Sequence, residues 1–233
     1  PPIALYVAAI SVGTAGVIAL LWRAGGSSAP GVMSARSVLL VSAAAHGAAL
    51  FGETRVEDDL DSFVWDGWRV QEAGTPYGVA PLSFLDDLSV PPAMQEALDW
   101  VNYPELPTIY GPALQIVFAL TSLVAGADPM GLRVVFALAA LATSAILLLR
   151  FSPERVALFA WSPFVVAETT LHLHPDILLS LTLVAALVWG RRHPLVAGLF
   201  LGLAAGVKLV ALAAWPMLLR LPPRPLAMAV DSV

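Results

Sequence analysis

The sequence predicts an all-α fold, a polytopic bundle of about seven transmembrane helices with a large extracytoplasmic first loop. The first observation is the composition, because 58% of the 233 residues are hydrophobic and only 12% are charged. The second is the distribution of charge: 12 of the 17 acidic residues, but only two of the 12 basic ones, lie between Phe51 and Pro107. The absence of cysteine excludes disulfides and thiolate metal sites, and no basic patch indicates a nucleic-acid partner.

Residues 1–51 are expected to form two membrane helices joined by a cytoplasmic linker. Ile3–Trp22 contains about twenty nearly uncharged residues, enough to cross a bilayer. The linker Arg23–Arg36 has two arginines and no acid, which places it in the cytoplasm by the positive-inside rule. Val38–Phe51 is the apolar body of the second span, and His46 within it is more often a packed, hydrogen-bonded residue than a ligand.

Residues 52–109 form the acidic loop, which is expected to be extracytoplasmic and to carry short amphipathic helices. If 59–70 is helical, Asp59 and Asp66 lie on one face, because they are separated by two turns. Trp65 and Trp68 flank that face with rings suited to a membrane surface. The alternative is an acidic, solvated loop that holds two membrane helices apart. The helix is expected to stop and the chain to turn at three residues: Gly74, Pro76 and Gly78.

Residues 110–233 are expected to form the rest of the bundle, incomplete at the C-terminus. Four crossings between the acidic loop and Arg191–Arg192 would place both on one face, although paired arginines belong in the cytoplasm. One of the first three apolar runs therefore re-enters or lies in the interface, with Pro112 and Pro163 as the candidate breaks. Residues 172–176 then return to the outer face. The apolar runs are 110–125, 132–149, 156–171, 177–189 and 195–219.

Three patches of unusual polar residues follow one another over most of residues 57–216. They are Asp59–Gly67 with Gly74–Pro81, then Asn102–Pro112 (NYPELPTIYGP), then the run from Glu168 through His174 and Asp176 to Lys208. In this order they resemble the GT-C-type glycosyltransferases, integral membrane enzymes that use polyprenyl-phosphate sugars, and in particular bacterial mannosyltransferase-like members. The resemblance implies an inverting hexosyl- or mannosyltransferase in the bacterial plasma membrane, with its acidic loop outside the cytoplasm.

The resemblance also implies roles for individual residues. Asp59 is the expected general base that takes a proton from the acceptor hydroxyl, with Asp58 as its neighbour and Asp66 as a third catalytic candidate. The expected partners are the lipid bilayer, a polyprenyl-phosphate-sugar donor, and a glycan or lipid acceptor. The expected substrate-binding residues are Trp65, Arg69, Tyr77, Tyr110, His174, Asp176 and Lys208.

A second hypothesis is a non-catalytic membrane subunit or scaffold that keeps the fold and binds partner membrane proteins. It is favoured by Asp61–Ser62–Phe63, which stands where the family pattern has Tyr-Arg-Tyr, so that an arginine is missing and an acid is added. The length also favours it, because members of the family usually run to longer chains. Either a fragment of an enzyme or a natural accessory subunit would have these features.

Two polar features near the end of the sequence remain. His174 and Asp176, with Glu168 and His172 nearby, could bind a divalent metal or the donor phosphate, although solvated residues at a helix end have the same pattern. Lys208 is the only lysine and lies inside an apolar run, where a charge is costly. We expect it to bind the donor phosphate, or to pair with Asp176 when no donor is present; a lysine that snorkels to the headgroups is the alternative.

Overall fold

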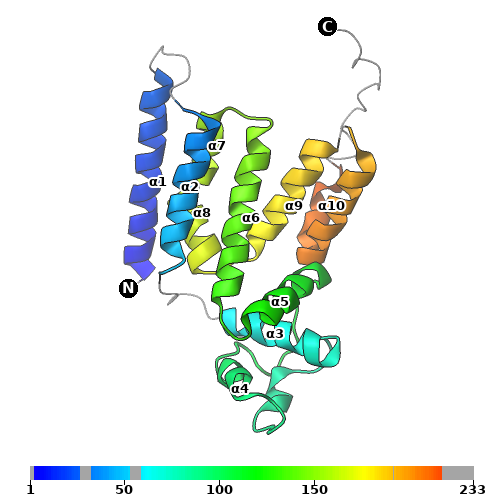
Figure 1. Cartoon of the computed structure of the whole chain (residues 1–233). Helices are drawn as coiled ribbons and strands as arrows, with labels where there is room; N and C mark the ends of the chain where they lie inside the picture. Colours follow the sequence, from blue (N-terminus) through cyan, green and yellow to red (C-terminus); the bar gives the residue numbers. More distant parts are fainter. Residues whose placement is uncertain (1–2, 27–32, 53–58, 191, 217–233) are drawn as a thin grey trace.

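The computed structural model describes residues 3–26, 33–52, 59–190 and 192–216, and all regular elements in this part of the chain are helices, without a strand (Figure 1). The all-α prediction is thereby confirmed. The helices are α1 (Ile3–Gly26), α2 (Ala35–Ala49), α3 (Leu60–Ala73), η1 (Pro81–Phe84), α4 (Pro92–Asp99), α5 (Pro112–Ala125), α6 (Met130–Leu148), α7 (Pro153–Ala160), α8 (Pro163–Val166), η2 (Ala167–Leu171), α9 (Asp176–Trp189), α10 (Pro194–Val207) and η3 (Leu209–Ala214).

The helices form an upright bundle with a smaller group of helices, α3, α4 and α5 with the segments that join them, at one end (Figure 1). We call this group the cap. Helices α1, α2, α6, α9 and α10 stand side by side, while α3, α4 and α5 gather below them. The turn between α9 and α10 lies at the end opposite the cap, as do the end of α1 and the start of α2. The two arginine-bearing connections of the sequence are thus attached to one end of the bundle, and the acidic segment lies at the other.

Two of the described helices are long and apolar enough to cross a membrane, α1 over Ala4–Leu21 and α6 over Met130–Leu148, each with a mean hydropathy of 2.1. The count rises to three if 163–171 and 176–189, bent by 118°, form one broken span. The prediction of about seven spans is not confirmed. Helices α5 and α10 have 14 residues each, about 21 Å at 1.5 Å per residue, which is less than the bilayer core of about 30 Å. The predicted second span, α2, has only 15 residues.

Helix α5 belongs to the cap and not to the upright bundle (Figure 1). It packs along α3 so closely that a Cβ atom on Gly67 would stand 2.4 Å from the carbonyl oxygen of Phe118. The chain then rises through α6 and returns through α7, α8 and η2, with a break before Pro163. In this course the first of the three apolar runs after the loop lies in the cap. The expectation that one of the three runs does not cross a membrane stays a prediction. Residues 172–175 consequently lie at the cap end.

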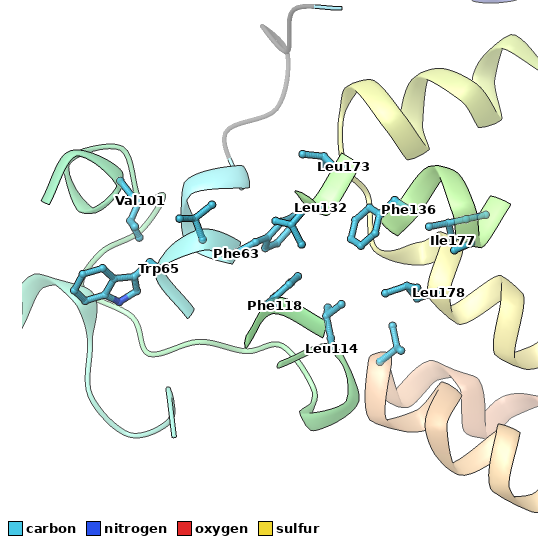
Figure 2. Packing of buried hydrophobic residues seen from close by; sticks show 14 of the residues in the cluster. Phe63, Trp65, Val101, Leu114, Phe118, Leu132, Phe136, Leu173, Ile177 and Leu178 are labelled. Carbon is cyan, nitrogen blue, oxygen red and sulfur yellow. The ribbon is translucent and has the colours of Figure 1, made fainter. Parts of the chain in front are cut away.

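One apolar cluster joins the cap to the bundle. Figure 2 shows Phe63 of α3 beside Phe118 of α5, with Leu132 and Phe136 of α6 continuing the row toward α9. The rings of Phe63 and Phe118 stack with centroids 4.7 Å apart. Because this cluster is continuous, the acidic segment is packed onto the helices and is not a free loop. The alternative of a solvated loop that merely separates two helices does not describe residues 59–109.

His46 is a packed residue of α2, as expected. Its side chain is only 1% exposed, and its Nδ1 atom lies 2.7 Å from the hydroxyl of Thr170. The imidazole thus connects α2 to η2 inside the bundle.

Candidate functional site

Helix α3 positions the two carboxylates that the sequence predicted to share a face. Its bounds are Leu60–Ala73, so Asp59 stands at the N-cap position, where its side chain makes no capping hydrogen bond. The helix ends at Gly74, whose φ of 72° is left-handed, and Gly78 follows with a φ of 83°, which confirms the predicted turn. The face that carries Phe63 and Asp66 is buried against α5.

A cavity of about 260 Å³ opens between α3 and residues 101–110. Its lining includes the acidic residues Asp59 and Asp66 together with three more polar residues, Ser62, Asn102 and Thr108. Its apolar and aromatic walls are Trp65, Pro81, Val101, Tyr103, Leu106, Pro107, Ile109 and Tyr110. No lysine, arginine or histidine is among these lining residues. Two acids and several aromatic rings in one small cavity are suited to an uncharged, hydroxyl-rich ligand.

Asp59 is half-buried at the start of α3 and meets Tyr110 from the segment before α5. The hydroxyl of Tyr110 donates a hydrogen bond of 2.9 Å to Oδ2 of Asp59. The ring of Tyr110 also packs edge-on against Phe63, with centroids 5.1 Å apart. Tyr110 therefore fixes the direction of the Asp59 carboxylate, and Asp59 keeps further acceptor capacity for a ligand hydroxyl.

Asp66 is 5% exposed and binds two partners with one oxygen. Its Oδ2 atom accepts hydrogen bonds from the hydroxyl of Thr108 at 2.5 Å and from the amide of Gln115 at 2.7 Å. Burial raises the pKa of Asp66 to about 6, and the two hydrogen bonds oppose this shift. The same Gln115 amide also donates to Thr108 at 3.0 Å. Asp66 therefore fastens the segment that carries Tyr110 to helix α3.

The other predicted residues of the first loop lie in different surroundings. Trp65 does not face a membrane surface: it is 2% exposed, packs against Trp68 and Phe84, and lines the cavity. Arg69 lies outside the cavity lining, with its guanidinium carbon 4.2 Å from the centroid of the Phe84 ring. This cation–π contact gives Arg69 a structural partner within the cap. The prediction that Arg69 binds substrate gains no support from this position.

Tyr77 does not line the cavity but binds Tyr110, which does. Its hydroxyl donates a hydrogen bond of 2.8 Å to the backbone carbonyl of Tyr110, while its ring is 42% exposed and lies outside the cavity lining. Tyr110 is thus held at its side chain by Asp59 and at its carbonyl by Tyr77.

Lys208 and Asp176 form an ion pair at the cap end of the bundle. The Lys208 ammonium lies 2.7 and 2.8 Å from the two oxygens of the Asp176 carboxylate, and both side chains remain partly exposed. This geometry agrees with the predicted pairing in a chain without donor. The apolar run that contains Lys208 is not one continuous α-helix, because α10 ends at Val207 and the backbone of Lys208 is extended, with φ −145° and ψ 130°.

A close backbone contact joins the entry to α5 with the end of α10, the helix that precedes Lys208. A Cβ atom on Gly111 would stand 2.1 Å from the carbonyl oxygen of Gly206, so the segment after Tyr110 touches the last turn of α10. Gly206 is thus required for the approach of a neighbouring segment, whereas a Cβ on Gly202 would meet nothing within 4 Å. Tyr110, which binds Asp59, directly precedes Gly111 in the chain, and Lys208, which binds Asp176, follows Gly206 by two residues.

A second polar cluster surrounds η2. Nδ1 of His174 lies 2.8 Å from Glu168, and the Tyr6 hydroxyl of α1 donates a hydrogen bond to the same carboxylate. His172, 7% exposed, packs edge-on against the Tyr6 ring at 5.2 Å. No group of three or more histidine and acidic side chains in the described residues is arranged to hold a metal ion. The geometry therefore does not support the divalent metal that the sequence suggested here.

Two of the site's residues were not identified from the sequence, and one predicted residue lies outside the described part. Thr108 and Gln115 were missed as the partners of Asp66. Gln115 did carry a signal, since it is the only amide in the apolar run of α5, where a buried polar group needs a partner. Asp58, predicted as the neighbour of Asp59, lies outside the described residues.

No family model matches the sequence, and no curated protein or solved structure is detectably similar to it. Function is therefore inferred from the residues and their geometry.

Proposed function

We propose that this chain is a membrane glycosyltransferase that moves a mannose-like sugar from a polyprenyl-phosphate donor to an acceptor hydroxyl, with inversion at the anomeric carbon. The observation that carries the proposal is the cavity in which Asp59, held by Tyr110, lies together with Trp65 and the buried Asp66. A carboxylate and aromatic rings are the groups that a sugar-binding catalytic pocket needs. The three polar patches of the sequence support the same class of reaction.

Asp59 would act as the general base. A sugar hydroxyl is a poor nucleophile, so a carboxylate must accept its proton as the oxygen attacks the anomeric carbon. The new bond forms from that oxygen to the anomeric carbon, the bond from this carbon to the phosphate oxygen breaks, and the lipid phosphate leaves with the electron pair. The hydrogen bond of 2.9 Å that the Tyr110 hydroxyl donates directs the Asp59 carboxylate.

Lys208 would bind the departing phosphate. The cavity itself has no cationic lining residue, which makes it a poor site for phosphate. Lys208 supplies an ammonium group close by, across the contact between Gly111 and Gly206. In this arrangement the donor phosphate replaces the Asp176 carboxylate as the partner of the Lys208 ammonium, and Asp59 acts from the lining of the acceptor cavity.

The cap would face the extracytoplasmic side of a bacterial plasma membrane. The acidic segment lies at one end of the bundle, and the arginine-bearing connections are attached to the other (Figure 1). Helices α1 and α6 have the length and hydropathy to cross the bilayer. The positive-inside rule then directs the cap outward.

The second candidate function is that of a non-catalytic membrane subunit. Two observations favour it: Asp61–Ser62–Phe63 contains no arginine to bind a phosphate, and Lys208 is already neutralised by Asp176. Such a subunit would keep the fold and contact partner membrane proteins through its exposed helices.

A transfer assay tests the proposal. The purified chain in nanodiscs would be given a radiolabelled polyprenyl-phosphate mannose and hexyl α-mannoside, and the product would be analysed by chromatography and by NMR of the new anomeric centre. We expect a labelled disaccharide whose anomeric configuration is inverted relative to the donor. If neither labelled product nor released polyprenyl phosphate rises above the level in empty nanodiscs, the result contradicts the proposal and favours the non-catalytic subunit.

A further inference from the structure

We propose that the cavity between α3 and residues 101–110 binds an amphipathic acceptor, an uncharged sugar headgroup attached to an aliphatic chain. This inference rests on the proposed function and specifies the acceptor. The headgroup occupies the buried, polar part of the cavity, and the chain lies across an apolar lip formed by Tyr103, Leu106 and Ile109, which line the same cavity.

The buried part of the cavity selects the headgroup. Asp66 and Trp65 are 5% and 2% exposed, so the ligand atoms that reach them leave water. Two carboxylates without a cationic neighbour in the lining repel phosphates and other anions, whereas they accept hydrogen bonds from hydroxyl groups. The volume of about 260 Å³ lies below the roughly 300–1,000 Å³ of pockets for drug-sized ligands. A single sugar ring suits it better than an oligosaccharide.

The lip has the opposite character. Tyr103, Leu106 and Ile109 are 65%, 55% and 87% exposed, three large apolar side chains within seven residues at the mouth of one cavity. Isolated exposed apolar residues are ordinary, but a group of them continuous with a polar cavity marks a binding surface. Tyr103 adds an independent observation, since its φ of 51° is an uncommon backbone conformation for a tyrosine. Such outliers cluster at ligand sites, where the surrounding structure holds them.

The position of the lip explains how a chain would reach it. Residues 103–109 immediately precede the segment that enters α5, and α5 adjoins the apolar helices at the cap end of the bundle (Figure 1). An acceptor anchored in the bilayer could therefore present its headgroup to Asp59 while part of its chain crosses the lip. A freely soluble sugar would have no use for three exposed apolar side chains beside its cavity.

Binding of two probes that differ only in chain length tests the inference. Methyl and hexyl α-mannoside would be titrated into the chain in nanodiscs, with empty nanodiscs subtracted to remove partitioning into lipid. The variant combines Leu106→Ser and Ile109→Ser. Leu88→Ser is the matched control, because Leu88 lies between η1 and α4, is 101% exposed and does not line the cavity.

We expect the hexyl glycoside to bind at least about tenfold more tightly than the methyl glycoside, since each methylene removed from water contributes about 0.8 kcal/mol, roughly a fourfold change in affinity. The double variant should lose this advantage and keep its affinity for the methyl glycoside, and Leu88→Ser should keep both.

Equal affinities in the unmodified chain, an advantage that survives in the double variant, or binding of neither glycoside would overturn the inference. These results are distinct from a failure of the proposed function. Efficient transfer to both glycosides without a chain-length effect would contradict only the amphipathic acceptor. The expected binding pattern without any transfer would contradict only the catalytic proposal.

Discussion

The hydroxyl of Tyr110 donates a hydrogen bond of 2.9 Å to the carboxylate of Asp59, which lies 51 residues earlier in the chain. The backbone carbonyl oxygen of Tyr110 accepts a second hydrogen bond, of 2.8 Å, from the hydroxyl of Tyr77. The residue after Tyr110, Gly111, touches the last turn of α10. Tyr110 is therefore the point at which the acidic cap, the entry to α5 and the segment before Lys208 come together.

Tyr110→Phe should lower the rate of sugar transfer by about tenfold or more, because a hydrogen bond to a charged group contributes about 1.5–3 kcal/mol. The ring packing against Phe63 and Phe118 is retained, so the melting temperature should change little. Steady-state transfer assays and thermal melts check both expectations. The hydroxyl of Tyr77 reaches only the backbone, so Tyr77→Phe should lower the rate less than Tyr110→Phe does. A larger loss in Tyr77→Phe would refute the role given to the Asp59–Tyr110 hydrogen bond.

Lys208→Met should weaken binding of the polyprenyl-phosphate donor at least about tenfold, because the phosphate loses its ammonium partner. Donor affinity is measured by titration in nanodiscs. Asp176→Asn is the comparison: it removes the competing carboxylate of the ion pair and should leave donor affinity unchanged or increased. Unchanged affinity in Lys208→Met, or an equal loss in both variants, would show that the ion pair only holds α9 and α10 together.

The fold and the site were predictable from sequence to different degrees. The all-helical class, the turn at Gly74 and the pairing of Lys208 with Asp176 followed from local signals: composition, glycine in a left-handed position, and charges placed in apolar runs. The number of spans did not follow, because hydropathy cannot distinguish α5, which lies on α3, from a helix that crosses.

The parts that were missed depend on contacts between distant segments. Asp66 accepts its hydrogen bonds from Thr108 and Gln115, which lie 42 and 49 residues away in the chain. No local sequence pattern selects those partners. The break of α10 at Lys208 likewise has no proline or glycine at the residue itself; it occurs where the last turn of α10 meets Gly111. Trp65 was assigned to a membrane surface because its burial against Phe84 requires the turn of 74–80 to fold back.

Asp66→Asn should flatten the dependence of stability on pH. Burial raises the pKa of Asp66 from 3.8 to about 6 in the folded chain, so the fold favours the protonated carboxyl. This contribution is fully present below about pH 3.8 and is lost as the pH rises through about 6, a change of at most about 3 kcal/mol. Asparagine stays neutral and avoids that loss.

Thermal melts of both proteins between pH 5 and pH 7.5 measure the effect. The unmodified chain should lose more stability across this range than Asp66→Asn. Asp99 is an exposed aspartate on α4, so Asp99→Asn should show the same change of melting temperature with pH as the unmodified chain. Identical slopes in all three proteins would show that Asp66 does not titrate between these values.

Single-cysteine variants should locate the cap outside the cytoplasm. The chain contains no cysteine, so Leu88→Cys in the cap and His193→Cys at the α9–α10 turn report unambiguously. A membrane-impermeant maleimide on intact cells should label position 88 directly and position 193 only after permeabilisation. The reverse pattern would invert the orientation.

Asp59→Asn tests the central claim most directly, because it removes the base and keeps the size of the side chain. The measurement is single-turnover transfer from a radiolabelled polyprenyl-phosphate mannose to hexyl α-mannoside, with donor affinity and melting temperature determined on the same preparations. Transfer should fall by about 10²–10⁴-fold with donor affinity and fold unchanged, while Asp99→Asn keeps normal turnover. Near-normal transfer by Asp59→Asn would contradict the assignment of Asp59 as the general base.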